Sequence, residues 1–471
     1  MSSHCYHYTP LSDICFSNES ITDWQFDEKA VSRSRKITQE AKSGIRRPIQ
    51  IVVATNRNLP FGEIVDSIIL STEGTGLLQA KRNNSSVVRF TLLLKGEDAV
   101  SILSKNQNHI SRLKNSGVQF NFEICNNSNS SSELSSAREC ALNYMRRISK
   151  EDNPIFLWLD DDLSFDSLIA YGNYISQCRP WSFFHEVWLF HESFPDVEVG
   201  LGDVTGAPPL PASSTLYTNI CDLVAGFNGE ETRTDFQRWR EHDYYYDLSD
   251  YDRNLEPWYI DINNLDQNQI LFDLLENGIV ARPLVVNGPG FQIQHERYIR
   301  GGNTIIFNSE WLDKIGHPNI PRRGDSIWSL MIKKRGGVLG HFPIPLRHIR
   351  DIRNENWTPK KALDNWLRRL EVDLIGASYQ RFYADDNSIL SPENILVKRA
   401  NKQLKLFDSA LKIIHKLPKK IENTLRHYIQ SGIKKTQELI ENPEVFSPYY
   451  KCMKENVTIL ENKLQPKEVK V

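Results

Sequence analysis

Hydrophobic residues between positions 47 and 165 follow two alternating patterns. Short runs of β-branched and other apolar residues, typical of buried strands, alternate with segments in which apolar residues recur every three or four positions, as in amphipathic helices. We expect strands at 49–54, 87–94, 118–125 and 155–159, and helices at 60–71, 97–115 and 134–148. This alternation predicts a Rossmann-type, mostly parallel sheet with helices on both faces.

The remainder of the chain changes character twice. Residues 200–300 contain a Pro-rich stretch and three tyrosines among acidic residues, which indicates long functional loops with short helices. Strand and helix patterns return at 304–350, and the chain is expected to be helical from 358 onward. We therefore predict an α/β fold class and a division into an N-terminal arm or packed extra element (1–46), an α/β domain (47–357) and a helical C-terminal region (358–471).

Composition narrows the class of protein. The 471 residues are 40% hydrophobic and 25% charged, which is ordinary for globular proteins, and the net charge of −2 gives no chain-wide attraction for nucleic acid. The seven cysteines form no CxxC pair, which favours reduced thiols. The first residues do not resemble a secretory signal, and no apolar run reaches the length of a bilayer span. A cytoplasmic protein is expected, membrane-associated at most.

Three consecutive aspartates supply the candidate chemistry. Asp160, Asp161 and Asp162 follow the strand at 155–159 directly. In α/β sheets, ligands bind at the carboxyl ends of the strands, and alternate residues of an extended segment point the same way. A single aspartate there would be interpreted as a helix cap. Three favour a site for a hard divalent cation with oxygen ligands.

Several motifs together resemble the nucleotide-sugar glycosyltransferases of the GT-A fold, in a family-2-like layout. The resemblance lies in SSARECALNYMRRISKEDNPIFLWLDDD, with its Ala-Arg helix before an Asp-x-Asp strand, and in the opening Asn56-Arg57. It continues in GGNTIIF from 301, RGDSIWSL from 323 and PLRH from 345, and covers about 47–350. The segment at 94–98, and Glu139 after Arg138, depart from the family pattern.

The resemblance divides the α/β domain into a nucleotide-sugar-binding half at 47–165, an acceptor-side insertion at 200–300 and an acceptor and catalytic-base half at 301–350. In the first half, it implies that Asp162 binds the metal directly and that Asp160 contacts the metal through water or the ribose. Asp161 would be a supporting contact.

Three further donor-side roles follow from the same resemblance. Arg138 would neutralise diphosphate charge, and Asn56 and Arg57 would hold the nucleoside. The alternatives are a surface arginine on an amphipathic helix for Arg138 and loop capping for the other two.

The second half implies the remaining roles. Asp325 would be the general base that takes the proton of the acceptor hydroxyl, giving inversion at the anomeric carbon; the alternative is a helix N-cap. His348 would complete the metal site, with His341 as the substitute if the register differs. Trp328 and the tyrosines at 244–246 are candidate stacking platforms, although aromatic residues more often serve packing.

The function implied is a metal-dependent glycosyltransferase using Mn²⁺ or Mg²⁺, a nucleotide-sugar donor and a glycan, lipid-linked or small-molecule acceptor. One alternative is a phosphohydrolase of the haloacid dehalogenase type, in which an apolar strand also ends in Asp-x-Asp. In that family the nucleophile usually follows the first core strand, whereas three strand-helix units precede Asp160 here. The other alternative is a non-catalytic module of the same fold that binds a glycan or a partner.

The C-terminal region has its own charge pattern. Residues 401–471 carry 14 Lys and Arg against 8 Asp and Glu, with apolar residues at helical spacing from Leu404 to Ile414. A packed helix with a solvated basic face is the first interpretation. Peripheral membrane contact and oligomer contact are the alternatives.

Overall fold

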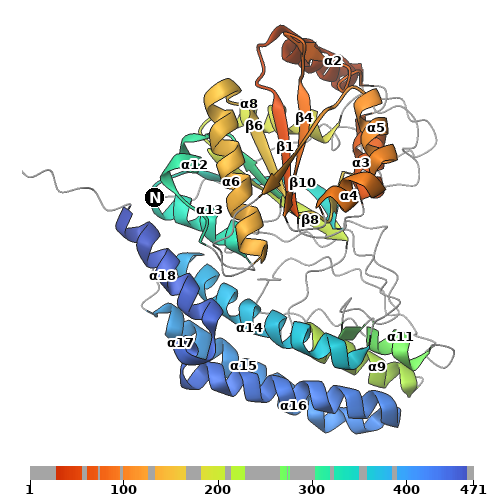
Figure 1. Cartoon of the computed structure of the whole chain (residues 1–471), viewed down its shortest axis with the longest axis vertical. Helices are drawn as coiled ribbons and strands as arrows, with labels where there is room; N and C mark the ends of the chain where they lie inside the picture. Colours follow the sequence, from red (N-terminus) through yellow and green to blue (C-terminus); the bar gives the residue numbers. More distant parts are fainter. Residues whose placement is uncertain are drawn as a thin grey trace, which may run out of the picture. The chain divides into compact units, whose positions relative to one another are not determined.

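The chain forms two compact units, which are described separately. The first unit contains Met1–Thr205, Arg300–His317 and Met331–Ile349, and the second contains Gly206–Ile299, Pro318–Leu330 and Arg350–Val471. The computed structural model (Figure 1) describes residues 28–55, 61–72, 75–95, 99–125, 133–165, 182–206, 214–228, 266–272, 274–275, 303–318, 323–348, 358–384 and 390–463.

Half of the sheet in the first unit is parallel, as the alternating pattern predicts. It consists of four strands, β1 (Ile49–Thr55), β4 (Val88–Lys95), β5 (Gln119–Cys125) and β6 (Ile155–Leu159). β1 lies between β4 and β6, and β5 pairs with the outer side of β4. All five residues of β6 are buried, which explains its continuous apolar sequence. The predicted strands are therefore confirmed to within a residue or two.

The other half of the sheet mixes strand directions. The full order is β5-β4-β1-β6-β9-β8-β10-β7. β9 is antiparallel to both β6 and β8, so β8 runs in the same direction as β6, and β7 is antiparallel to β10. The four strands of this half are β9 (Asn303–Ile306), β8 (Val199–Gly206), β10 (Leu339–His348) and β7 (Leu163–Ser164). The α/β class is thus confirmed, with a mixed sheet.

Helices cover both faces of this sheet (Figure 1). On one face, side chains of β1 share a hydrophobic core with α3 (Phe61–Thr72), α5 (Gln107–Asn115) and α8 (Phe183–Ser193). On the other face lies α6 (Glu133–Asp152), whose Tyr144 hydroxyl is 2.7 Å from the hydroxyl of Thr91 on β4. Gln50 on β1 donates to the same Thr91 oxygen, so these three buried side chains satisfy one another.

Two local expectations need correction. The helix expected at 97–115 is observed as two helices, α4 (Ala99–Lys105) and α5, and at Asn106 between them both the backbone N–H and the side-chain amide donate to the carbonyl of Ile102. Residues 199–206, where loops were expected to begin, form β8 within the sheet. Gly200 lies close to the ring of Phe307, which leaves little room for a side chain and weakens the strand pattern in the sequence.

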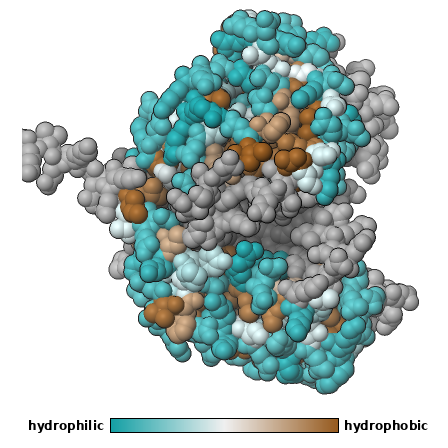
Figure 2. Space-filling model, viewed as in Figure 1, coloured by the Kyte–Doolittle hydropathy of each residue, from teal (hydrophilic) through white to brown (hydrophobic). Residues whose placement is uncertain are grey.

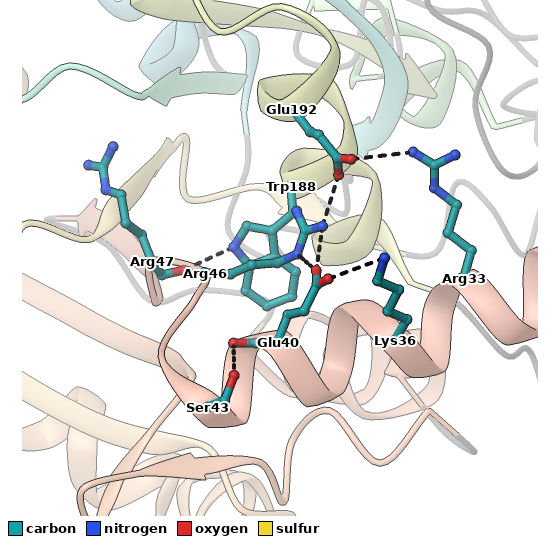
Figure 3. A network of polar contacts seen from close by, with 8 residues as sticks. All are labelled: Arg33, Lys36, Glu40, Ser43, Arg46, Arg47, Trp188 and Glu192. Carbon is teal, nitrogen blue, oxygen red and sulfur yellow. Dashed lines mark hydrogen bonds and ion pairs between the residues drawn. The ribbon is translucent and has the colours of Figure 1, made fainter.

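Part of the segment expected to be an N-terminal arm is a packed helix. In α2 (Glu28–Ser43), the buried positions Ser34, Ile37, Thr38 and Ala41 recur at helical spacing. Arg46 joins α2 to α8 (Figure 3): its Nε donates to Glu40 at 2.7 Å and its Nη2 donates to Glu192 at 2.8 Å. The hydrogen bond from Arg46 lowers the pKa of Glu192. Arg33 and Lys36 add longer, exposed contacts that contribute little.

A buried histidine fixes the same two helices from inside. The backbone N–H of Ser182 donates to Nδ1 of His185 at 3.0 Å, so Nε2 carries the proton and donates to the Thr38 hydroxyl at 2.9 Å. Burial lowers the pKa of His185 to about 3, and the charge of Arg46 acts in the same direction. His185 is therefore neutral in the folded protein at physiological pH.

The second unit contains a bundle of long helices. They are α14 (Pro359–Ala384), α15 (Pro392–Ile413), α16 (Lys419–Glu441) and α18 (Pro448–Lys463), with the short helices η2 (Ile414–Lys416) and α17 (Pro443–Phe446) between them. α9 (Ser214–Phe227) and α11 (Gln267–Phe272) pack against this bundle. The expected helical C-terminal region is confirmed by these elements.

Packing and capping account for the bundle. Trp366 of α14 packs against Phe407 and Tyr428, and Gly432 of α16 lies close to the Trp366 ring. Ser391 caps α15 by accepting the N–H of Asn394. The coloured part of the surface in Figure 2 is mostly hydrophilic, and no described helix is both long and apolar enough to cross a membrane.

The first unit should lose stability on mild acidification because of His185. Its folded pKa of about 3 lies below the unfolded value of about 6.5. The unfolded chain therefore binds this proton first, and the stabilisation present above pH 6.5 declines as the pH falls. The expected loss at pH 5 is about 2 kcal/mol. Amide hydrogen exchange in α8 at pH 7.5 and pH 5, corrected for intrinsic rates, measures it, and His185→Gln should remove most of the change. An equal pH dependence in the variant would contradict this assignment.

Candidate functional site

The three aspartates lie where the parallel strands end. Because β1, β4 and β6 are parallel and in register, Thr55, Leu94 and the residues after Leu159 share one edge of the sheet. Asp160 follows Leu159 directly, and its side chain is 42% exposed. A charged group is costly to bury, so the buried apolar strand β6 ends before Asp160. The carboxylates therefore lie at the edge of the sheet and not in its core. This is the edge at which α/β sheets bind ligands.

Asp161 is held by the neighbouring strand. The hydroxyl of Thr55, the last residue of β1, donates to Oδ2 of Asp161 at 2.5 Å. Thr55 is only 1% exposed, so its side chain is fixed by packing. The bond joins the ends of β1 and β6 and orients the loop that carries all three carboxylates. The role of Asp161 as a supporting contact for a ligand stays a prediction.

Asp160 contacts the helix that precedes β6. Nη2 of Arg138, on α6, lies 3.3 Å from Oδ1 of Asp160. The Arg138 side chain is 12% exposed, so it is not a surface arginine of the kind considered as the alternative. Two residues predicted for the donor site from different elements are therefore in contact. Together they place a guanidinium and a carboxylate side by side at the ligand edge.

The backbone also brings His348 to the aspartates. In the antiparallel pairing of β7 with β10, Leu163 lies opposite His348 and Ser164 lies opposite Arg347. The backbone of His348 is therefore one residue away from that of Asp162 across the pair. The loop is anchored on its other side, because the N–H of Phe165 donates to the Ser67 hydroxyl of α3 at 2.9 Å. The side chain of His348 lies outside the described residues, whereas His341 is described and exposed.

Some predicted residues fall outside the described part of the chain. These are Asn56 and Arg57, and also the tyrosines at 244–246. In the part that is described, no group of three or more His, Cys, Asp and Glu side chains is arranged to hold a metal ion. The nucleoside contacts and the metal site remain predictions.

Asp325 belongs to the second unit. It lies in the first turn of α13 (Gly324–Lys334) and is mostly buried. Arg323 precedes this helix with a left-handed φ of +65°, and its Nη1 donates to Gln380 of α14 at 2.5 Å. Its Nη2 is 3.5 Å from Oδ1 of Asp373. The start of α13 is thus fastened to α14. Trp328 is fully buried, which fits packing.

Two residues beside the aspartates, at the edge of the sheet in the first unit, were not predicted as site residues. Thr55 precedes Asn56 and has no motif of its own, so only its contact with Asp161 reveals it. Asn303 begins β9, is fully buried and pairs with Leu159, immediately before Asp160. Gly202 on β8 leaves space for the Asn303 side chain, since a Cβ there would collide with its amide. The Gly-Gly-Asn sequence at 301–303 was the available signal for Asn303.

Comparison with known proteins adds no assignment. A scan against protein-family models finds none that matches the chain, and a search of curated proteins finds no match.

The hydrogen bond between Thr55 and Asp161 should stabilise the first unit. A hydrogen bond to a charged group contributes about 1.5–3 kcal/mol when desolvated, and Asp161 is half-buried, so we expect a coupling of about 1–2 kcal/mol. A double-mutant cycle of Thr55→Val and Asp161→Ala, followed by urea unfolding, measures this coupling. A value near zero would show that the bond does not hold the loop.

Proposed function

We propose that this protein is a metal-dependent glycosyltransferase that moves a sugar from a nucleotide-sugar donor to an acceptor hydroxyl. The observation that carries the proposal is the gathering of Asp160, Asp162, Arg138 and the His348 backbone at the carboxyl end of β6. Arg138, Asp160 and Asp162 come from one motif of the GT-A resemblance and His348 from another, and the contact of Arg138 with Asp160 and the pairing of Leu163 with His348 support a shared location for the two motifs. That agreement supports the family interpretation more strongly than any motif alone.

The chemistry of the residues at this edge fits a divalent cation. Carboxylate oxygens of Asp160 and Asp162 with an imidazole nitrogen of His348 are ligands that Mn²⁺ accepts, and Mg²⁺ accepts the carboxylates. In a glycosyltransferase such an ion acts as the Lewis acid that offsets the charge of the departing diphosphate. Arg138 would add a fixed positive charge, because its guanidinium already lies beside Asp160.

Asp325 is the proposed general base. It lies in the first turn of α13, where its side chain is mostly buried and carried by a helix whose start is fastened to α14. A base that accepts the proton of the acceptor hydroxyl implies a single displacement with inversion. The same proposal assigns recognition of the donor to residues 47–165. It assigns recognition of the acceptor, which would be a glycan, a lipid-linked molecule or a small molecule, to residues 200–300 and 301–350.

Donor binding should require both the metal and Asp162. In thermal unfolding with a panel of nucleotide sugars, we expect one donor to raise the melting temperature only when Mn²⁺ is present. At about 100 times its dissociation constant it should add about 2.7 kcal/mol. Asp162→Asn should abolish the shift, and Asp196→Asn, at an exposed aspartate of the same unit, should preserve it. No shift with any donor in a folded protein would overturn the donor site, and cleavage of a phosphomonoester without an acceptor would favour a phosphohydrolase.

Asp325→Asn should separate chemistry from donor binding. The amide cannot accept the proton of the acceptor, so transfer should fall by about two to four orders of magnitude. The Mn²⁺-dependent thermal shift with the donor should remain. Transfer measured by product formation under saturating donor tests this, and retained activity would assign the base to another residue. Donor binding without transfer by the wild type would favour the non-catalytic module.

A further inference from the structure

The turn between α15 and α16 concentrates positive charge. Residues 412–420 include four lysines and one histidine but no acidic residue. We define the basic tip as five side chains, all exposed: Lys412, His415, Lys416, Lys419 and Lys420. They come from the last turn of α15, from η2 and from the first turn of α16, so they share one end of a helical hairpin (Figure 1).

The basic tip is firmly built. Ile414 and Leu417 are buried beneath it, and the N–H of Leu417 donates to the carbonyl of Ile414 at 3.0 Å. α9 packs against η2 from the side of the bundle. Among the described residues, none of the large apolar side chains that are exposed lies between 391 and 444. The tip therefore presents its charged side chains on a fixed backbone. It has no exposed large apolar side chain that could insert into an apolar medium.

Among the described side chains of α15, α16 and α17, the acidic groups leave most of this charge uncompensated. Glu422 accepts hydrogen bonds from Lys419 at 2.9 Å and from Arg426 at 2.8 Å, so one carboxylate serves two cations. Asp408 lies one helical turn before Lys412 on α15 and is exposed. The acidic residues Glu438, Glu441 and Glu444 belong to the other end of α16 and to α17, about 30 Å along the helix.

We propose that the basic tip docks the protein onto an anionic lipid bilayer. Lysines are hydrated point charges that suit diffuse attraction to a layer of headgroups, whereas bidentate recognition of individual phosphates uses arginine, which the tip lacks. The tip also has no Phe, Tyr or Trp, the larger aromatic side chains on which the bases of a single-stranded nucleic acid stack. A hairpin end brings several cations to a flat surface together, and adsorption needs no apolar insertion. This inference is independent of the proposed transferase activity.

Sedimentation of the full chain with lipid vesicles tests the proposal. At about 0.1 M salt, we expect binding to phosphatidylcholine vesicles that contain about one-third phosphatidylserine and none to pure phosphatidylcholine vesicles. Replacing the four tip lysines by glutamine should lower the partition coefficient at least tenfold, since each lysine near the surface contributes about a fivefold factor at most. Raising the salt to about 0.5 M should have a comparable effect on the wild type.

A matched variant separates the effect of the tip lysines on vesicle binding from the effect of a lower net charge. It carries the same Lys→Gln change at four exposed positions elsewhere in the bundle: Lys360, Lys398, Lys434 and Lys451. This control should bind within about twofold of the wild type. Equal loss in both variants, equal binding to neutral vesicles, or no binding to anionic vesicles would overturn the proposal. Tip-dependent binding to a nucleic acid in place of vesicles would overturn it also. Thermal unfolding of both variants confirms that each is folded.

Discussion

The constraint on which the first unit depends is the backbone pairing of β6. Its five residues are buried and pair with β1 on one side and with β9 on the other. Buried backbone groups need partners, so a strand in this position must be extended and apolar along its whole length. The first charged residue ends it. The requirement that makes the strand apolar therefore also explains why Asp160 stands at its end. The parallel register then places Asp160 level with the end of β1.

Charge at this edge is stabilised by neighbours that are themselves fixed. Thr55 is immobilised by packing and Arg138 by its place on α6, so each carboxylate that they contact has little freedom to turn. Ordering the two groups during folding removes an entropic cost that a flexible loop would incur on ligand binding. The antiparallel addition of β7 to β10 has the same effect on the backbone after Asp162. The site thus inherits its rigidity from the sheet.

Local sequence pattern predicted the elements far better than it predicted their neighbours. The four parallel strands and the capped helices have strong periodicity, so their existence and approximate bounds follow from the chain. The insertion of β9 between β6 and β8 pairs residues that are more than a hundred positions apart, and no local pattern encodes that contact. Gly200 and Gly202 further weaken the signal of β8. Within the site, Asp160–Asp162 and Arg138 were accessible from motifs, whereas Thr55 became visible only through its contact with Asp161.

The helical bundle treats buried and exposed charges differently, and the difference bears on the cluster of lysines at the α15–α16 turn. Buried charges in the bundle are paired, as Glu371 is with Lys435 at 2.8 Å, because an unpaired buried charge would be costly. The lysines at the α15–α16 turn repel one another and gain no packing from their ammonium groups. Stability of the fold therefore does not explain their clustering, since lysines spread over the bundle would give the same solubility with less repulsion. A negatively charged surface outside the chain removes that repulsion when it binds, and this gain gives the cluster a physical reason to exist.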